Sequence, residues 1–172
     1  MSETAPICGF IYDEGETAQT LMVRIVDDLR GRNRRIAGAV QYDRRRPGRR
    51  HCDMFLENLA TGKVVQISED RGEGASGCRL DRNAFATIEA ELLQTLGARP
   101  ELLIVNKYGK TEVEGAGLRA VIAQAMALEV PVLVGVPRRN LESWNEFVGE
   151  FALAGETESV VENWLAAALE RA

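Results

Sequence analysis

Residues 6–17 read Pro-Ile-Cys-Gly-Phe-Ile-Tyr-Asp-Glu-Gly-Glu-Thr, an apolar run followed by a short polar turn. Such a run, ending in a turn that contains Gly15, predicts a buried strand that enters a loop. Directly after the turn, apolar side chains recur at helical spacing: Ala18, Leu21, Met22, Ile25, Val26 and Leu29. This periodicity predicts an amphipathic helix. The chain therefore opens with a strand, a loop and a helix.

The rest of the chain repeats the alternation of apolar strand and amphipathic helix. Further strands are predicted at 35–42, 102–105 and 131–136, and helices follow Asp81, Gly117, Asn140 and Thr157. Asp81, Asn140 and Thr157 are the residue types that cap a helix N-terminus. Two strand-like segments flank a turn at 60–62 and predict a β-hairpin inserted at about 51–68. We predict one domain over residues 1–172, a three-layer α/β fold with a mainly parallel sheet.

In such a sheet, ligands bind at the carboxyl ends of the strands. The loops at 12–17, 106–117 and 137–140 should therefore build any site. We expect small anionic ligands, because arginine suits oxyanion contacts and an arginine pair follows the 131–136 strand. The candidate ligand-binding residues in these loops are Asp13, Gly15, Glu16, Thr17, Asn106, Lys107, Gly109, Lys110, Glu112, Arg138 and Arg139.

The first loop has the position of a phosphate-binding loop but not its chemistry. Such a loop needs a lysine before the Ser or Thr that opens the helix, and Glu16 stands there instead. A magnesium-binding carboxylate is expected at the end of a buried strand, yet Asn106 and Lys107 follow residues 102–105. We therefore expect no nucleotide hydrolysis. The two reversed charges are interpreted either as a Glu16–Lys107 ion pair or as unrelated surface charges.

Charge and composition narrow the range of partners. The net charge is −5, although ten arginines and three acidic residues lie between Arg24 and Arg50. Because the whole chain is acidic, nucleic-acid binding is disfavoured. The arginine-rich segment 44–50 is predicted to be a loop. It is interpreted either as solvated and mobile or as a site for an acidic protein partner, an oxyanion or nucleic acid. No apolar run spans a bilayer and no signal sequence is present, so we expect a cytoplasmic location and no membrane partner.

Three scattered residues are weak candidates for a metal site. His51, Cys52 and Cys78 would meet only if the hairpin and the following Gly-rich segment folded together. The favoured interpretation is two small apolar side chains and a surface histidine. We expect no stable Cys52–Cys78 disulfide in a reducing compartment.

The order of elements resembles that of the small P-loop nucleoside-triphosphatases first described from thermophiles. Gly15, Thr17, Gly109, Glu112 and the arginine pair match that pattern, whereas the loop lysine and the acidic pair do not. The chain is more similar to an uncharacterised bacterial domain of unknown function, related to those enzymes and often associated with molybdate transport. That likeness is carried by Cys52-Asp53-Met54, Arg71-Gly72, Gly77-Cys78-Arg79-Leu80-Asp81 and the residues from Val105 to Lys110.

This resemblance implies a P-loop-NTPase-like fold and a nucleotide or oxyanion as the ligand. The leading interpretation is a degenerate member, a ligand-binding or regulatory protein without hydrolysis. One alternative is an active nucleotide hydrolase or phosphotransferase that uses Lys107 or Lys110 in place of the loop lysine. Another is an oxyanion-binding accessory protein in molybdenum metabolism. A thermal-shift screen against nucleotides and oxyanions distinguishes the three.

Overall fold

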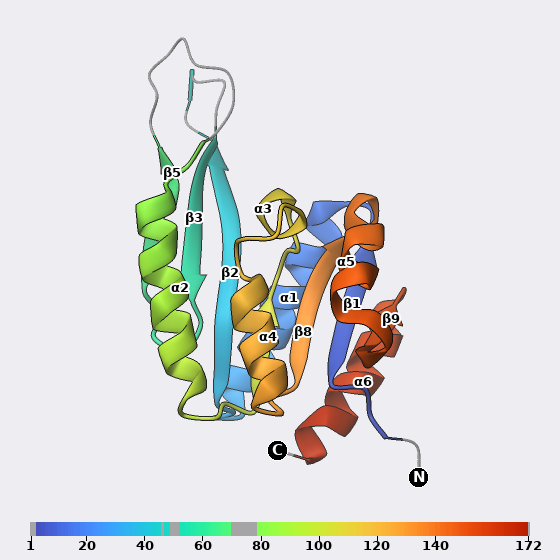
Figure 1. Cartoon of the computed structure of the whole chain (residues 1–172). Coiled ribbons are helices and arrows are strands. Elements are labelled where there is room, and N and C mark those ends of the chain that lie inside the picture. Colours follow the sequence, from blue (N-terminus) through green and yellow to red (C-terminus); the bar gives the residue numbers. More distant parts are fainter. Residues whose placement is uncertain (1–2, 46, 49–51, 70–78, 172) are drawn as a thin grey trace.

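A computed structural model describes residues 3–45, 47–48, 52–69 and 79–171, which form an α/β fold (Figure 1). The main sheet has seven strands in the order β4-β3-β2-β7-β8-β1-β9. These strands are β1 (Ile7–Tyr12), β2 (Ile36–Arg45), β3 (Cys52–Asn58), β4 (Val64–Gln66), β7 (Leu102–Val105), β8 (Val132–Pro137) and β9 (Ala152–Gly155). The helices are α1 (Gly15–Gly31), α2 (Arg82–Leu96), α3 (Lys110–Val113), α4 (Arg119–Ala127), α5 (Leu141–Val148) and α6 (Glu158–Glu170). The short strands β5 (Ser68–Glu69) and β6 (Arg79–Leu80) pair separately, and single 3₁₀ turns cover Arg138–Asn140 and Gly149–Phe151.

The sheet is parallel through its centre and antiparallel at one side. Strand β1 pairs in parallel with β8 and β9, and β7 pairs in parallel with β2 and β8. The predicted hairpin forms, because β3 pairs antiparallel with β4, and β3 also pairs antiparallel with β2. The α/β class and the mainly parallel sheet are therefore confirmed.

Strand β2 is longer than the sequence pattern indicated. Its pairing with β7 ends where Ala39 meets Val105, but its pairing with β3 continues to Arg45. Residues 40–45 therefore extend past the carboxyl end of β7 as a two-stranded ribbon with β3. Arg44, expected in a loop, lies in this ribbon, with its guanidinium 5.0 Å from the centre of the Phe55 ring. Arg46, Arg49 and Arg50, the other arginines of the predicted basic loop beyond β2, lie outside the described residues.

Helices cover both faces of the sheet. Figure 1 shows α2, α4 and α5 on one face and α1 and α6 on the other. Side chains of the central strands alternate between the two layers: Leu103 and Val105 pack on the side of α2 and α4, whereas Leu102 and Ile104 pack on the side of α1. A strand buried on both faces needs a continuous apolar sequence, which explains why the strands predicted at 102–105 and 131–136 match β7 and, within one residue at each end, β8.

Two of the three predicted N-cap residues cap their helices with a side-chain hydrogen bond. The side chain of Asp81 accepts hydrogen bonds from the backbone N–H groups of Asn83 and Ala84, and the hydroxyl of Thr157 accepts one from Val160. Asn140 occupies the predicted N-cap position of α5, but it does not cap the helix through its side chain. Its side chain makes no bond to the α5 backbone and instead donates to the carbonyl of Tyr108 at 2.8 Å. Asn140 therefore ties the chain after β8 to the loop after β7.

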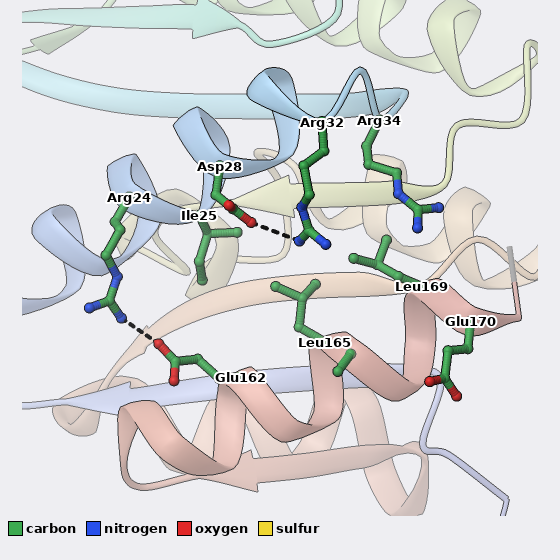
Figure 2. Close-up of a pocket in the computed structure, with 10 residues that line it drawn as sticks. Arg24, Ile25, Asp28, Arg32, Arg34, Glu162, Leu165, Leu169 and Glu170 are labelled. Carbon is green, nitrogen blue, oxygen red and sulfur yellow. Dashed lines mark hydrogen bonds and ion pairs between the residues drawn. The ribbon is translucent and has the colours of Figure 1, made fainter.

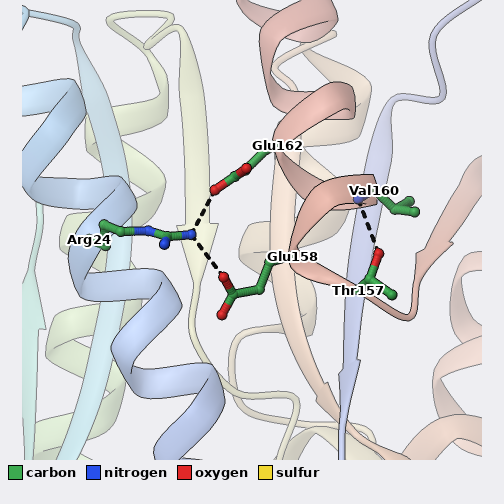
Figure 3. Close-up of polar contacts among 5 residues, drawn as sticks. All are labelled: Arg24, Thr157, Glu158, Val160 and Glu162. Atoms are coloured by element: carbon green, nitrogen blue, oxygen red, sulfur yellow. Dashed lines mark hydrogen bonds and ion pairs between the residues drawn. The ribbon is translucent and has the colours of Figure 1, made fainter.

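A broad hollow of about 540 Å³ lies between α1 and α6 (Figure 2). Its arginines already have carboxylate partners. Arg24 binds Glu158 at 3.1 Å and Glu162 at 2.7 Å (Figure 3), Arg32 binds Asp28 at 2.7 Å, and Arg34 binds Glu101 at 2.8 Å. The pairs made by Arg24 hold the two helices side by side, so we interpret the hollow as structural. None of the helices in the described part of the chain is long and apolar enough to cross a bilayer.

Candidate functional site

A smaller pocket of about 330 Å³ opens at the carboxyl ends of the parallel strands. We call it the strand-end pocket. It is lined by Tyr12, Gly15, Glu16, Ala18, Gln19, Gln41, Tyr42, Asp43, Asn106, Lys107 and Arg139. The structure thus brings together residues from all three loops that the sequence analysis selected. Of the predicted site residues, Gly15, Glu16, Asn106, Lys107 and Arg139 line this pocket.

Strand β2 supplies a wall of the pocket that sequence reasoning missed. Gln41, Tyr42 and Asp43 belong to the part of β2 that extends beyond β7. The rule that ligands bind at strand carboxyl ends applies equally to β2, and applying it to the predicted 35–42 strand would have found these residues. Tyr42 also stacks on Phe55, with ring centres 5.7 Å apart.

The connection from β1 to α1 is short. Only Asp13 and Glu14 separate the last residue of β1 from the first residue of α1, and Glu14 makes no side-chain hydrogen bond to the helix. A phosphate-binding loop needs several successive backbone N–H groups that surround the phosphates, and two residues are too few to form that ring. Thr17 is exposed on the first turn of α1 and does not line the pocket.

Asn106 is buried, and its side-chain amide makes three hydrogen bonds. Its Oδ1 accepts from the backbone N–H of Gln41 at 2.8 Å. Its Nδ2 donates to the carbonyl of Gln41 at 2.7 Å and to Oε1 of Gln19 at 3.1 Å. The residue that stands where a metal-binding carboxylate was expected therefore joins β7, β2 and α1.

Two cations reach the strand-end pocket from neighbouring strands. Lys107 follows β7 and is half-buried, while Arg139 follows β8 and is exposed. Burial raises the pKa of Tyr12, and the positive charge of Arg139, which lines the same pocket, acts against that shift. The ion pair considered between Glu16 and Lys107 does not form: among the described residues, no ion pair joins them.

Arg138 has a different role from Arg139. Its guanidinium binds Asp13 at 3.0 Å and Glu156 at 2.7 Å, and these hydrogen bonds raise its pKa. Glu156 follows β9, an edge strand that was not predicted. Arg138 and Asp13 therefore fasten β1, β8 and β9 to one another, and neither lines the strand-end pocket.

The loop after β7 contains the short helix α3, where the sequence predicted only loop. Gly109 is its N-cap residue, and Lys110 is exposed, 3.9 Å from Glu114. Glu112 is 6% exposed, and burial raises the pKa of its carboxyl to about 7. Backbone hydrogen bonds, including those from Leu118 and Gly109, and the charge of Lys107 act against that shift. The buried Glu112 carboxylate thus stabilises the loop after β7 through these backbone hydrogen bonds. It does not line the strand-end pocket.

The side chains of the three weak candidates for a metal site fall outside the part of the chain that the structure describes. His51, Cys78 and the side chain of Cys52 lie outside the described residues. Within the described part of the chain, no three His, Cys, Asp or Glu side chains gather in a way that would hold a metal.

The mainly parallel seven-stranded sheet, with helices on both faces and a pocket at the strand ends, defines an α/β fold. The crystal structure of THEP1 from the hyperthermophile Aquifex aeolicus superposes with a TM-score of 0.64 at 18% identity, covering 96% of this chain and 98% of that one. Residues 7–164 match the family described as "Protein of unknown function (DUF2478)", and the chain belongs to that family.

A curated relative is the molybdenum import ATP-binding protein ModC 2 of Bradyrhizobium diazoefficiens. It is 30% identical over 159 residues, which cover 92% of this chain. The same match covers 18% of the relative, so this chain spans about a fifth of its length.

Proposed function

We propose that this protein binds a small anionic ligand in the strand-end pocket and does not hydrolyse nucleoside triphosphates. One observation carries the proposal. Lys107 and Arg139 both line the pocket, and neither has a carboxylate within ion-pair distance among the described residues. Cations left without a partner in a concave site are available to an anion.

The dimensions of the pocket support a small ligand. Its volume of about 330 Å³ lies near the lower end of the range for ligand sites, roughly 300–1,000 Å³. Gly15 and Glu16, which open α1, form part of the wall. The positive end of the helix dipole there favours negative charge, while the carboxylate of Glu16 opposes it.

Three features argue against hydrolysis. The two-residue connection between β1 and α1 lacks the backbone N–H groups of a phosphate-binding loop. Glu16 replaces the lysine that would stabilise the transferring phosphoryl group. Asn106 stands in place of a carboxylate, and its neutral amide, whose Oδ1 already accepts from the backbone N–H of Gln41, is a poorer magnesium ligand than aspartate.

A second candidate function is favoured by the similarity to ModC 2, whose name describes a molybdenum import ATP-binding protein. In this version the ligand is a tetrahedral oxyanion such as molybdate, and the protein works alongside molybdenum import. The same two cations, Lys107 and Arg139, would bind the oxyanion, with Arg139 able to donate two parallel hydrogen bonds.

Thermal-shift measurements at constant ionic strength test both versions. ATP, GTP, magnesium, molybdate and sulfate are added separately, because a ligand that binds only the folded state raises Tm. We expect at least one anion to raise Tm, and a response to molybdate but not to the nucleotides supports the second candidate. Lys107→Met and Arg139→Gln should abolish the shift, while Lys63→Met and Arg82→Gln, outside the pocket, should keep it. No shift with any anion would refute the proposal.

A further inference from the structure

The strand-end pocket holds charges of both signs that do not pair with one another. Glu16 and Asp43 line it together with Lys107 and Arg139. Among the described residues, no ion pair with an N···O distance within 4.0 Å involves any of these four side chains. The formal charge of the lining is therefore zero, and its four charges stay separate from one another.

Charged side chains around the strand-end pocket, unlike the four that line it, form ion pairs. Arg138, the neighbour of Arg139, is bound by two carboxylates. Lys110 lies 3.9 Å from Glu114, and the arginines of the hollow between α1 and α6 are paired as well. Oppositely charged side chains that share one small pocket attract one another. In this structure the four lie beyond ion-pair distance of one another, so charges of both signs line the space that a ligand would fill.

The backbone explains how they are kept apart. Glu16 stands on the first turn of α1 and Asp43 on the ribbon of β2 and β3. Lys107 and Arg139 follow the central strands β7 and β8. The amide of Asn106 fixes β2 against β7 and α1 through Gln41 and Gln19, so the acidic and basic sides are attached to elements that are locked in place.

We propose that the strand-end pocket binds a small amphoteric molecule, one that carries an anionic group and a protonated amine or amidine. The anionic group faces Lys107 and Arg139, and the cationic group faces Glu16 and Asp43. This inference rests on the proposed function and names its ligand class more closely. A simple anion would gain the two cations but would also face two carboxylates, whereas an amphoteric ligand satisfies all four.

Neutralising Glu16 and Asp43 should change the affinity for a simple anion and for an amphoteric ligand in opposite directions. Removing the negative charges of Glu16 and Asp43 relieves repulsion on a simple anion and should strengthen its binding. The same change removes the partners of the ligand's cationic group and should weaken binding of an amphoteric molecule. Both carboxylates are exposed and have no ion pair among the described residues, so the variant should fold normally.

Calorimetric titration with phosphoethanolamine and propyl phosphate tests this directly, because the two differ by an ammonium in place of a methyl group. Ethanolamine, which lacks the phosphate, is the third probe. We expect phosphoethanolamine to bind at least about tenfold more tightly than propyl phosphate or ethanolamine. In the double variant Glu16→Gln, Asp43→Asn that preference should disappear and propyl phosphate should bind more tightly than to the natural protein. The exposed pair Asp27→Asn, Glu146→Gln is the matched control and should leave both affinities unchanged.

The outcomes separate this inference from the proposed function. Equal binding of phosphoethanolamine and propyl phosphate overturns the amphoteric ligand and leaves anion binding intact. A preference that survives in the double variant also overturns it. If neither phosphate ester binds, and no anion raises the Tm of the natural protein, the anion-binding proposal is overturned as well.

Discussion

The side-chain amide of Asn106 pairs with both backbone groups of Gln41, accepting from its N–H at 2.8 Å and donating to its carbonyl at 2.7 Å. The pair continues the contact between β7 and β2 beyond the point where the regular ladder between the strands ends at Val105 and Ala39. An asparagine at this position thus holds the β2 wall of the pocket, because its amide both accepts through Oδ1 and donates through Nδ2.

Replacing Asn106 by aspartate should therefore destabilise the fold. The change removes both donated hydrogen bonds and places a buried carboxylate against the carbonyl of Gln41. We expect the free energy of unfolding to fall by roughly 2–4 kcal/mol, measured by urea denaturation. Asn145→Asp, on the exposed face of α5, should change it by less than about 0.5 kcal/mol. An Asn106→Asp variant as stable as the natural protein would contradict the conclusion that the Asn106 amide holds β2 against β7.

Glu112 should make stability depend on pH. Burial raises the pKa of its carboxyl from 4.5 to about 7 in the folded protein. Between these values the folded state binds the extra proton, so stability falls as the pH rises from about 4.5 to about 7. The full effect is roughly 3 kcal/mol. Urea denaturation at pH 5 and pH 8 should show a larger loss for the natural protein than for Glu112→Gln, and identical losses would contradict the buried, titrating carboxyl.

Gly135 should resist substitution because the loop after β7 crosses it closely. The backbone N–H of Tyr108 donates to the carbonyl of Gly135 at 2.7 Å, and a Cβ on Gly135 would overlap the carbonyl oxygen of Asn106. Gly135→Ala should cost about 1–3 kcal/mol of unfolding free energy and weaken anion binding by moving Asn106 and Lys107. Gly31→Ala, where a Cβ meets no atom within 4 Å, is the control and should not lower stability.

Hydrolysis of ATP or GTP with magnesium should stay at background in a phosphate-release assay. The Glu16→Lys variant sharpens the test, because it restores the charge of a phosphate-binding loop without lengthening the connection between β1 and α1. We expect that variant to bind anions more tightly and still to release no phosphate. Turnover by the natural protein that is lost in Lys107→Met would show that the protein is an enzyme.

Much of the fold followed from the sequence because the central strands are apolar on both faces and the helices carry a clear periodicity. The edge strand β9 was missed because it has only four residues, Ala-Leu-Ala-Gly, and its two middle residues are exposed. The last three residues of β2 were missed because Asp43, Arg44 and Arg45 are polar, and their pairing with β3 keeps them extended.

The site was predictable as a set of loops but not as a set of contacts. Sequence order placed Arg138 and Arg139 together, yet one binds Asp13 and Glu156 while the other lines the pocket. That difference depends on β9, which carries Glu156 to the end of β1. The Glu16–Lys107 pair was one of two interpretations of the reversed charges, because charge reversal gives no distance between the two side chains.

The central claim is that Lys107 and Arg139 bind an anion in the strand-end pocket. Isothermal titration calorimetry with inorganic phosphate and with molybdate, compared between the natural protein and the Lys107→Met, Arg139→Gln double variant, tests it most directly. We predict saturable binding of at least one of the two anions, close to one per chain, that is lost in the double variant and retained in Lys63→Met, Arg82→Gln. Binding of equal strength in the double variant, or no binding of either anion to the natural protein, would contradict the claim.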